Sequence, residues 1–382
     1  MGRESIDRFV EQNREKLVEL IQKISSISSP TGKESEKAHF VKSLLDDLPG
    51  SPGAEIDQAG NVLLRIDGKE TGNVSLAVAH IDTVFEDAGE IHPEIKGGYI
   101  YAPSAGDNSA NVAGLISAAE YLLANPGVSR NSLLFAFSVG EEGMGNLRGM
   151  RHIMEKHGDI IKEVIAVDGG CDKVMNFAVS SKRFSVKVSA EGGHSWYDFG
   201  NSNAVTIAAE IIGHIYSIQV PVNPRTTYNI GLFNGGRSIN SIAEDAEFTM
   251  DMRSLDHGAL QKLEEDFIAV VEETALPYSA SGSRVDITLL AERPGGKTPE
   301  TSRIVRKVLE ARELAGLDNE FYPSSTDANI PMSLEIPSVT FGIYRGEGAH
   351  TVHERIEIGS LDEGMRGLLY SLVNLSSPNG LI

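Results

Sequence analysis

Short apolar runs alternate with helix-like stretches in the first half of the chain, and no other feature constrains the fold as strongly. Buried parallel strands read as continuous apolar runs, and the connections between them are usually helical. The pattern therefore predicts an α/β fold, with a mainly parallel sheet covered by helices. Helical stretches and apolar runs follow one another at residues 5–48, 74–79, 111–123, 132–138, 147–157 and 164–167.

The pattern changes after Asn176. Four stretches alternate apolar and polar residues, as antiparallel strands with one exposed face do. Strand, helix and strand occur twice, which predicts a small inserted α+β domain of the ferredoxin-like type. The expected strands are residues 183–190, 226–232, 246–253 and 285–290, and the expected helices are 204–218 and 258–274.

The first pattern returns after the turn-rich segment 292–297, with a helix expected at 302–315 and a buried strand at 338–344. We therefore expect one domain made of residues 1–180 and 292–382, interrupted by a second domain at 181–291. Near the start of the chain, Thr31 and Glu34 are expected to form a capping box for the second helix.

Composition disfavours several kinds of partner. The formal net charge of −20 works against nucleic acid and anionic membranes, because phosphate binding depends on clustered Lys and Arg. No apolar run approaches the length of a membrane span or of a secretory signal core. Cys171 is the only cysteine, so no intrachain disulfide is possible. We expect a cytoplasmic protein with no nucleic-acid or membrane partner.

Side chains that bind metals or transfer protons follow each expected parallel strand. In an open α/β sheet ligands bind at the carboxyl ends of the strands, so these residues are expected to converge. With one cysteine, a metal site must consist of His, Asp and Glu, which suits zinc, manganese or cobalt in a hydrolytic role. The residues are His80, Glu141, Glu142, Asp168, His350 and His353, and Asp107 lies in a loop that can join them.

The charges of this set suit two divalent ions. The ions carry four positive charges, and three carboxylates with a shared hydroxide carry four negative ones, so the cluster is neutral. Asp107 is the expected bridge, because a short side chain in a Gly-Asp-Asn loop can be held between two ions. Glu141 and Glu142 are adjacent and cannot both point the same way on an extended backbone. One of them is therefore expected to bind metal, and the other to take a proton from the attacking water.

Seven short motifs make the chain resemble the co-catalytic zinc peptidases and amidohydrolases. This family includes peptidase T, succinyl-diaminopimelate desuccinylases, glutamate carboxypeptidases and aminoacylases. The resemblance spans nearly the whole chain, with peptidase T as the nearest guess. The motifs are His80-x-Asp82-Thr83-Val84, Gly106-Asp107-Asn108, Gly140-Glu141-Glu142-Gly143, Asp168-Gly169-Gly170, Gly192-Gly193-His194-Ser195, Asp251-x-Arg253, and His350 followed by Glu354.

The resemblance implies a zinc exopeptidase-like catalytic domain that binds two zinc ions, with Mn²⁺ or Co²⁺ as alternatives. It also implies a reaction in which a hydroxide that bridges the two ions attacks the amide carbon. The implied ligands are His80 and Asp168 for one ion, Glu142 and His350 for the other, and Asp107 for both.

The same resemblance assigns roles to two further carboxylates. Glu141 is implied to be the general base that later gives its proton to the leaving amine, and Asp82 is implied to orient His80. His350 is favoured over His353 as the ligand, because it stands at the family's spacing ahead of Glu354.

Residues 181–291 are implied to form a lid that closes over the substrate and makes a homodimer. His194 is implied to polarise the scissile carbonyl, in its own subunit or across the dimer, and Arg253 and Asn240 are implied to bind a substrate carboxylate.

The favoured activity is hydrolysis of short peptides by an aminopeptidase of the peptidase T type. A carboxypeptidase and a deacylase that acts on N-acyl amino acids are the near alternatives, because the Gly192–Ser195 and Asp251–Arg253 motifs resemble those branches. A non-catalytic metal-binding protein on the same fold is the remote alternative. Glu141 argues against it, since a closed structural metal site has no use for an extra carboxylate.

Overall fold

The computed structural model describes residues 2–86, 89–128 and 131–376 of the 382. The chain divides into two compact units, unit 1 with Met1–Ala178 and Gly296–Ile382, and unit 2 with Val179–Gly295. No helix within the described ranges is long and apolar enough to cross a membrane.

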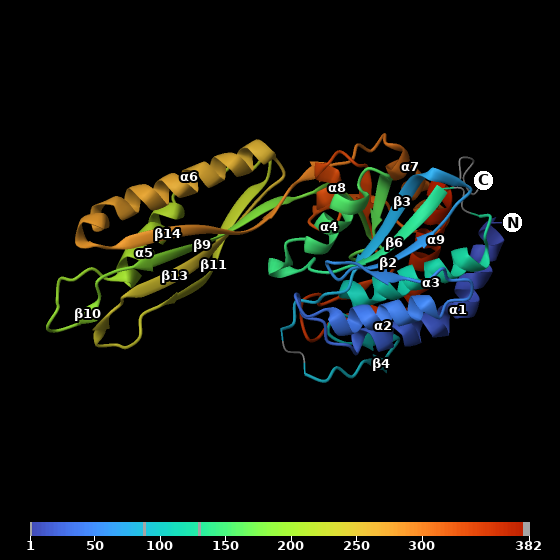
Figure 1. The fold of residues 1–382 in the computed structure, drawn as a ribbon, viewed down its shortest axis with the longest axis horizontal. Coiled ribbons are helices and arrows are strands. Elements are labelled where there is room, and N and C mark those ends of the chain that lie inside the picture. The colour runs from blue at the N-terminus through green and yellow to red at the C-terminus, as the bar shows by residue number, and fades with distance from the viewer. Residues whose placement is uncertain (1, 87–88, 129–130, 377–382) are drawn as a thin grey trace. The chain divides into compact units, whose positions relative to one another are not determined.

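Unit 1 is built around a nine-stranded sheet with the order β1-β2-β6-β3-β7-β17-β8-β15, and β16 pairs with β8. Figure 1 labels β2, β6 and β3 of this sheet. The successive pairs β6–β3, β3–β7 and β7–β17 are parallel, which confirms the predicted α/β class with a mainly parallel sheet. The strands are β1 (Glu55–Ile56), β2 (Val62–Ile66), β3 (Glu70–His80), β6 (Asn131–Ser138), β7 (Ile161–Ala166), β8 (Lys173–Ala178), β15 (Gly296–Lys297), β16 (Glu320–Ser324) and β17 (Ser338–Thr340).

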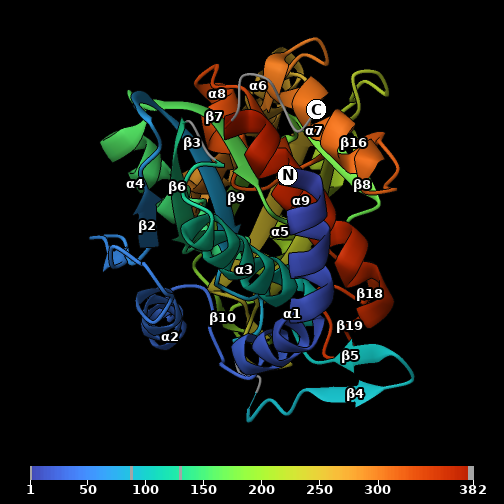
Figure 2. The same ribbon diagram turned by 90° about the vertical axis from the view of Figure 1, so that its right-hand side faces the viewer.

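Helices cover both faces of this sheet (Figure 2). Side chains of a strand alternate between the two faces, so Phe135 and Phe137 of β6 join one hydrophobic cluster and Leu134 and Ala136 join the other. The first cluster includes α1 (Gly2–Ser25), α2 (Ser35–Asp46), α3 (Asn111–Ala124), α7 (Arg303–Leu314) and α9 (Leu361–Ser376), and the second includes α4 (Arg148–His157) and α8 (Asn329–Ser333).

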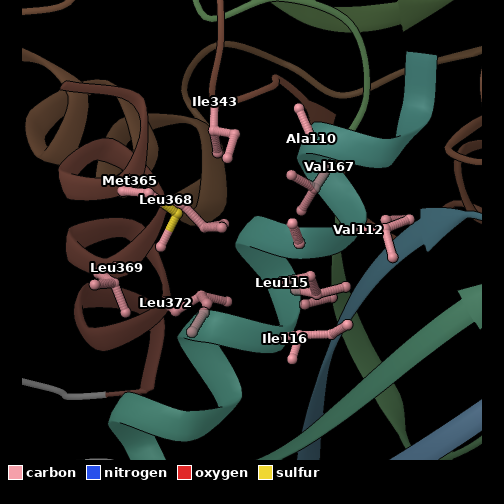
Figure 3. Packing of buried hydrophobic residues seen from close by; sticks show 14 of the residues in the cluster. Ala110, Val112, Leu115, Ile116, Val167, Ile343, Met365, Leu368, Leu369 and Leu372 are labelled. Carbon is pink, nitrogen blue, oxygen red and sulfur yellow. The ribbon is translucent and has the colours of Figure 1, made fainter. Parts of the chain in front are cut away.

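The packing of α3 against α9 supports the loops at the carboxyl ends of the strands (Figure 3). Leu115 of α3 and Leu368 of α9 are fully buried, and Val167 belongs to the same cluster. Full burial of such a side chain contributes about 1.5–3 kcal/mol. Because Val167 immediately precedes Asp168, this core fixes the start of the loop that carries that carboxylate.

A small antiparallel sheet in unit 1 holds the loop between its last two strands. Its order is β18-β19-β5-β4, and residues 348–354 connect β18 to β19. The loop that bears His350 is therefore fixed at both ends. The strands are β4 (Glu94–Lys96), β5 (Tyr99–Tyr101), β18 (Gly346–Glu347) and β19 (Arg355–Glu357).

Unit 2 is a four-stranded antiparallel sheet with the order β11-β13-β9-β14 and two helices (Figure 1). The chain order β-α-β-β-α-β and this strand order match the predicted ferredoxin-like arrangement. Asn203 and Asp256 cap the two helices through their side chains. The elements are β9 (Ser180–Ser189), α5 (Ala204–Ile215), β11 (Thr226–Gly235), β13 (Asp245–Ser254), α6 (His257–Ala275) and β14 (Arg284–Arg293), with a short pair β10 (Gly193–His194) and β12 (Ser241–Ile242).

Two local predictions are wrong. The strand expected at 338–344 ends at Thr340, because the chain then turns toward the sheet edge as an irregular loop. The capping box is absent, since α2 begins after Glu34, whose side chain makes no capping bond. Oγ1 of Thr31 instead donates a hydrogen bond of 2.8 Å to Oδ2 of Asp82, so that hydroxyl serves another segment.

Candidate metal centre

The structure brings five of the predicted residues together at the carboxyl ends of β3, β6 and β7. His80 is the last residue of β3, and the loops after β6 and β7 carry the two ligand candidates that follow those strands. Parallel neighbours end at one edge of the sheet, which explains why residues distant in sequence meet there. These five are the predicted ligands His80, Asp107, Glu142, Asp168 and His350, and Glu141 forms a further group with His80 and Glu142.

Asp107 lies between the two histidines. Its Oδ1 is 3.1 Å from Nε2 of His80, and its Oδ2 is 3.0 Å from Nε2 of His350. Oδ1 of Asp168 lies 3.8 Å from Nε2 of His80, and Oε1 of Glu142 lies 3.1 Å from Nε2 of His350. One carboxylate thus faces two separate His–carboxylate pairs.

These contacts form two groups whose ligand atoms lie within 4.8 Å of one another, and Asp107 belongs to both. One group contains His80, Asp107 and Asp168, and the other contains Asp107, Glu142 and His350. Nitrogen and oxygen ligands without sulfur suit zinc, manganese or cobalt. The side chains present therefore fit two divalent ions that share Asp107.

The ionisable side chains of the cluster lie close enough to shift one another's pKa values. Burial and the like charges of Asp107 and Glu142 raise the pKa of Asp168 to about 7, although His80 opposes this. Hydrogen bonds to Asp107 and Glu142 raise the pKa of His350 to about 10. Burial would lower the pKa of His80, but its interactions with Asp107 and Asp82 raise it. The carboxylates favour positive charge beside them, and divalent cations compete with protons for such ligands.

The ring of His80 is oriented by the main chain of Asp82. Its Nδ1 lies 3.1 Å from the backbone carbonyl oxygen of Asp82 and 3.6 Å from Oδ1 of the same residue. Because a carbonyl only accepts, Nδ1 carries the proton in the neutral ring, and the lone pair of Nε2 faces Asp107 and Asp168. This is the tautomer that a metal ligand requires.

The carboxylate of Asp82 holds the loop after β6. Oδ1 accepts a hydrogen bond of 2.9 Å from the backbone N–H of Glu141, and Oδ2 accepts one of 2.9 Å from that of Glu142. Glu141 is 4% exposed, and one of its carboxylate oxygens lies within 4.8 Å of ligand atoms of His80 and Glu142. Both glutamates therefore reach the centre.

The structure separates the two histidines that were candidates for one position. His350 has φ of +64°, a left-handed conformation that is uncommon for non-glycine residues. His353 is exposed and belongs to none of the metal-like groups among the residues that the structure describes. His350 is thus the histidine that reaches the cluster.

The three residues expected to bind substrate all lie in unit 2. His194 is exposed, and its Nδ1 accepts a hydrogen bond of 3.2 Å from the backbone N–H of Trp196, so the neutral ring carries its proton on Nε2. Asn240 is its neighbour, since the backbone N–H of Ser195 donates to the carbonyl oxygen of Asn240. Arg253 is near the far end of β13, eight residues from the first residue of that strand, which is roughly 25 Å along the strand at the usual rise per residue.

Sequence reasoning gave no role to several residues that surround Asp107. Glu354 served only to mark the spacing of His350, yet its side chain is buried against the Asp107 loop. Tyr322 and Tyr344 line a cavity of about 300 Å³ that also reaches Asp107 and Glu354. The position of Glu354 in the last motif was the one available signal, and nothing in the sequence marked the tyrosines.

Comparison with known proteins identifies the family of the chain. Residues 76–374 match the sequence model of peptidase family M20/M25/M40. A succinyl-diaminopimelate desuccinylase of Wolinella succinogenes is 24% identical over 93% of this chain and 99% of its own length.

Two solved structures share the fold. A tripeptidase of Staphylococcus aureus has a TM-score of 0.79 and 24% identity, covering 95% of this chain and 98% of its own. The aminopeptidase PepT of Bacillus cereus has a TM-score of 0.76 and 22% identity, covering 96% and 99%. The family match spans most of the chain and includes every residue of the cluster at the sheet edge. The chain therefore belongs to peptidase family M20/M25/M40 and is a metal-dependent peptidase or amidohydrolase.

Proposed function

We propose that the protein is an exopeptidase that hydrolyses short peptides at a two-metal centre, and that it acts as an aminopeptidase of the peptidase T type. The observation that carries this proposal is the sharing of Asp107 by two metal-like groups, with the buried carboxylate of Glu141 beside them. The cavity of about 300 Å³ next to Asp107 offers room for part of a short peptide.

Asp107, His80, Asp168, Glu142 and His350 would hold the ions. Two divalent ions, zinc by preference and manganese or cobalt as alternatives, would polarise the scissile carbonyl and make a nucleophilic hydroxide available near neutral pH.

The proton transfers are assigned to Glu141. Its carboxylate would take the proton of the attacking water and deliver it to the leaving amine, as a general base that becomes a general acid. Asp82 would keep this loop in place through the two backbone N–H groups that it accepts. His80 would remain in the ligand tautomer described above.

Unit 2 would supply the contacts to the substrate. The Nε2–H tautomer of His194 suits a donor to the developing oxyanion, while Arg253 and Asn240 would bind a substrate carboxylate. His194 and Arg253 lie too far apart within unit 2 to contact the same short peptide from one subunit. Their joint use requires a second copy of the chain, which supports His194 acting across a homodimer.

The homodimer is assigned to residues 181–291. Strand β11 is an edge strand of the unit 2 sheet, with Leu232 64% and Phe233 42% exposed. Such an edge can pair with another chain.

We also propose that the protein is cytoplasmic and has no nucleic-acid or membrane partner, on the basis of its charge and single cysteine.

Substitution of the general base tests the mechanism. We expect Glu141→Gln to retain the wild-type metal content, measured by elemental analysis, and to lose activity by at least ~100-fold. Glu94→Gln, on the exposed strand β4, is the control and should behave as wild type. Full activity of Glu141→Gln would reject the mechanism. Loss of metal would mean that Glu141 and Glu142 have exchanged roles.

The identity of the products separates the near alternatives. We expect tripeptides with a free amine to lose their N-terminal residue, and N-acetylated tripeptides and N-acyl amino acids to remain intact. Release of the C-terminal residue would indicate a carboxypeptidase, and release of the acyl group from N-acyl amino acids would indicate a deacylase. Mass spectrometry of the products distinguishes these outcomes.

A further inference from the structure

Glu354 is a buried carboxylate attached to the loop that carries Asp107. It is 1% exposed and directly precedes β19. Its Oε1 accepts hydrogen bonds from the backbone N–H of Asp107 at 2.9 Å and of Gly106 at 3.2 Å. Its own carbonyl oxygen accepts from the backbone N–H of Ala102 at 3.2 Å. Both the side chain and the main chain of Glu354 thus fix this loop.

The loop that carries Asp107 packs closely against the side chain of Glu354. A Cβ atom added to Gly106 would lie 2.7 Å from Oε1 of Glu354 and 2.5 Å from Cζ of Tyr344. Distances this short do not occur between real atoms of these kinds, so glycine is needed for this close approach. The loop cannot move toward Glu354, and its two N–H groups hold it from moving away.

Burial of the Glu354 carboxylate costs folding free energy. Among the residues that the structure describes, no group donates a hydrogen bond to its Oε2. A buried acceptor without a donor typically costs about 1–3 kcal/mol. A glutamine would satisfy the same two backbone donors, whereas an apolar residue would remove the unpaired oxygen but leave both donors without an acceptor. The position of the carboxylate therefore calls for an explanation beyond stability.

The loop after β6 is held in the same way. There Asp82 accepts the backbone N–H groups of Glu141 and Glu142, as Glu354 accepts those of Gly106 and Asp107. Each side of the centre thus has a buried carboxylate that binds two consecutive N–H groups of a loop that bears candidate ligands.

We propose that Glu354 is a positioning residue that aims the carboxylate of Asp107 at both halves of the centre. An aspartate has only two side-chain torsions, so the orientation of its backbone largely decides where its oxygens lie. Oδ1 and Oδ2 of Asp107 must face His80 and His350 respectively, at 3.1 and 3.0 Å. Glu354 fixes the peptide plane from which they project. The proposal rests on the two-metal function proposed above.

Three variants test this role. Glu354→Asp withdraws the acceptor from the loop but keeps the charge, Glu354→Gln keeps an acceptor of the same length, and Glu357→Asp is a matched control on β19. Each purified protein is freed of metal and titrated with Zn²⁺ by calorimetry. The melting temperature of the metal-free protein and the kcat and KM for a tripeptide are also measured.

We expect Glu354→Asp to bind Zn²⁺ roughly 10–100-fold more weakly at both positions, the usual effect of removing a residue that orients ligands. Its kcat should fall more than its KM changes, and the metal-free melting temperature should stay near that of the control. Glu354→Gln should recover most of the affinity. Glu354→Gln is nearly isosteric with the native residue, so it is expected to fold even if the shorter Glu354→Asp does not.

Two outcomes would overturn the proposal. One is wild-type Zn²⁺ affinity in Glu354→Asp, and the other is a loss of affinity in Glu354→Gln as large as that in Glu354→Asp, which would mean that a hydrogen-bond acceptor at the native position is not enough. Failure of the proposed function looks different. In that case the wild-type protein itself would bind fewer than two ions or would hydrolyse peptides equally well without them.

Discussion

The carboxylate of Asp82 accepts a hydrogen bond of 2.9 Å from the backbone N–H of Glu141. This bond joins the end of β3 to the loop after β6, two segments that the sequence separates by 59 residues. Burial would raise the pKa of Asp82, but its bonds to His80 and to the two backbone N–H groups lower it. The residue therefore stays ionised and ties the candidate general base to the metal centre.

Replacement of Asp82 by Asn is expected to reduce activity and metal affinity by about 10–100-fold. An amide NH₂ cannot accept a hydrogen bond, so one of the N–H groups of Glu141 and Glu142 loses its partner. Thr31→Val is the control, because it removes only the hydroxyl donor to Asp82. Steady-state kinetics and Zn²⁺ titration measure both effects. Equal effects of the two substitutions would contradict the special role of the loop contact.

Replacement of Asp107 by Asn is expected to weaken the binding of both ions. Asp107 belongs to two of the three metal-like groups among the described residues, and an amide has one ligand oxygen and no negative charge. We expect fewer than two ions per chain after dialysis against a weak chelator, measured by elemental analysis. Asp67→Asn, at an exposed surface position, should retain the wild-type content. Loss of a single ion with the other bound at wild-type strength would argue against a bridge.

Lys37 is expected to make the stability of unit 1 increase as the pH rises from about 8 to 10.5. Its side chain is 2% exposed, and burial lowers its pKa from 10.5 to about 8. Between these values the unfolded chain binds more protons than the folded one, so stability rises with pH. Below about pH 8 the ammonium is charged in both states and destabilises the fold by the full amount.

Lys37→Met removes this titration. The variant should therefore be more stable than wild type at about pH 8, and its advantage should shrink by roughly 3 kcal/mol as the pH approaches 10.5. Urea unfolding at several pH values measures the difference. A difference that is constant across this range would show that Lys37 keeps an ordinary pKa in the folded protein.

Two glycines are expected to respond in opposite ways to alanine. Gly213 is exposed within α5, and nothing lies within 4 Å of the position of a Cβ atom there. Gly213→Ala should stabilise unit 2 by about 0.5–1 kcal/mol. At Gly342 a Cβ atom would lie 1.7 Å from the carbonyl oxygen of Gly169, beside Asp168. Gly342→Ala should destabilise unit 1 by about 1–3 kcal/mol or more.

Differential scanning calorimetry checks this pair, because it can resolve the transitions of two units. The Gly342 variant should also lose activity, since a displaced Gly169 moves the loop that carries Asp168. A Gly342→Ala protein as stable and active as wild type would contradict the packing at this sheet edge.

Local sequence patterns were sufficient for most elements of the fold. The apolar run that ends at His80 and the alternation around Phe248 and Met250 each identified a strand, because the burial of a strand follows its period of two. The capping box at Thr31 and Glu34 failed for a different reason. The hydroxyl of Thr31 is bound by Asp82, and no local pattern reports a competing partner 51 residues away.

The sequence by itself determined the α/β class, the ferredoxin-like insertion and the set of residues that converge at the sheet edge. It could do so because strand periodicity is local and the ends of parallel strands share one edge. Tertiary structure decided which histidine joins the cluster and which backbone groups Asp82 and Glu354 hold. These contacts depend on loop conformations, and a loop's path is set by distant partners that close on it only when the whole fold has formed.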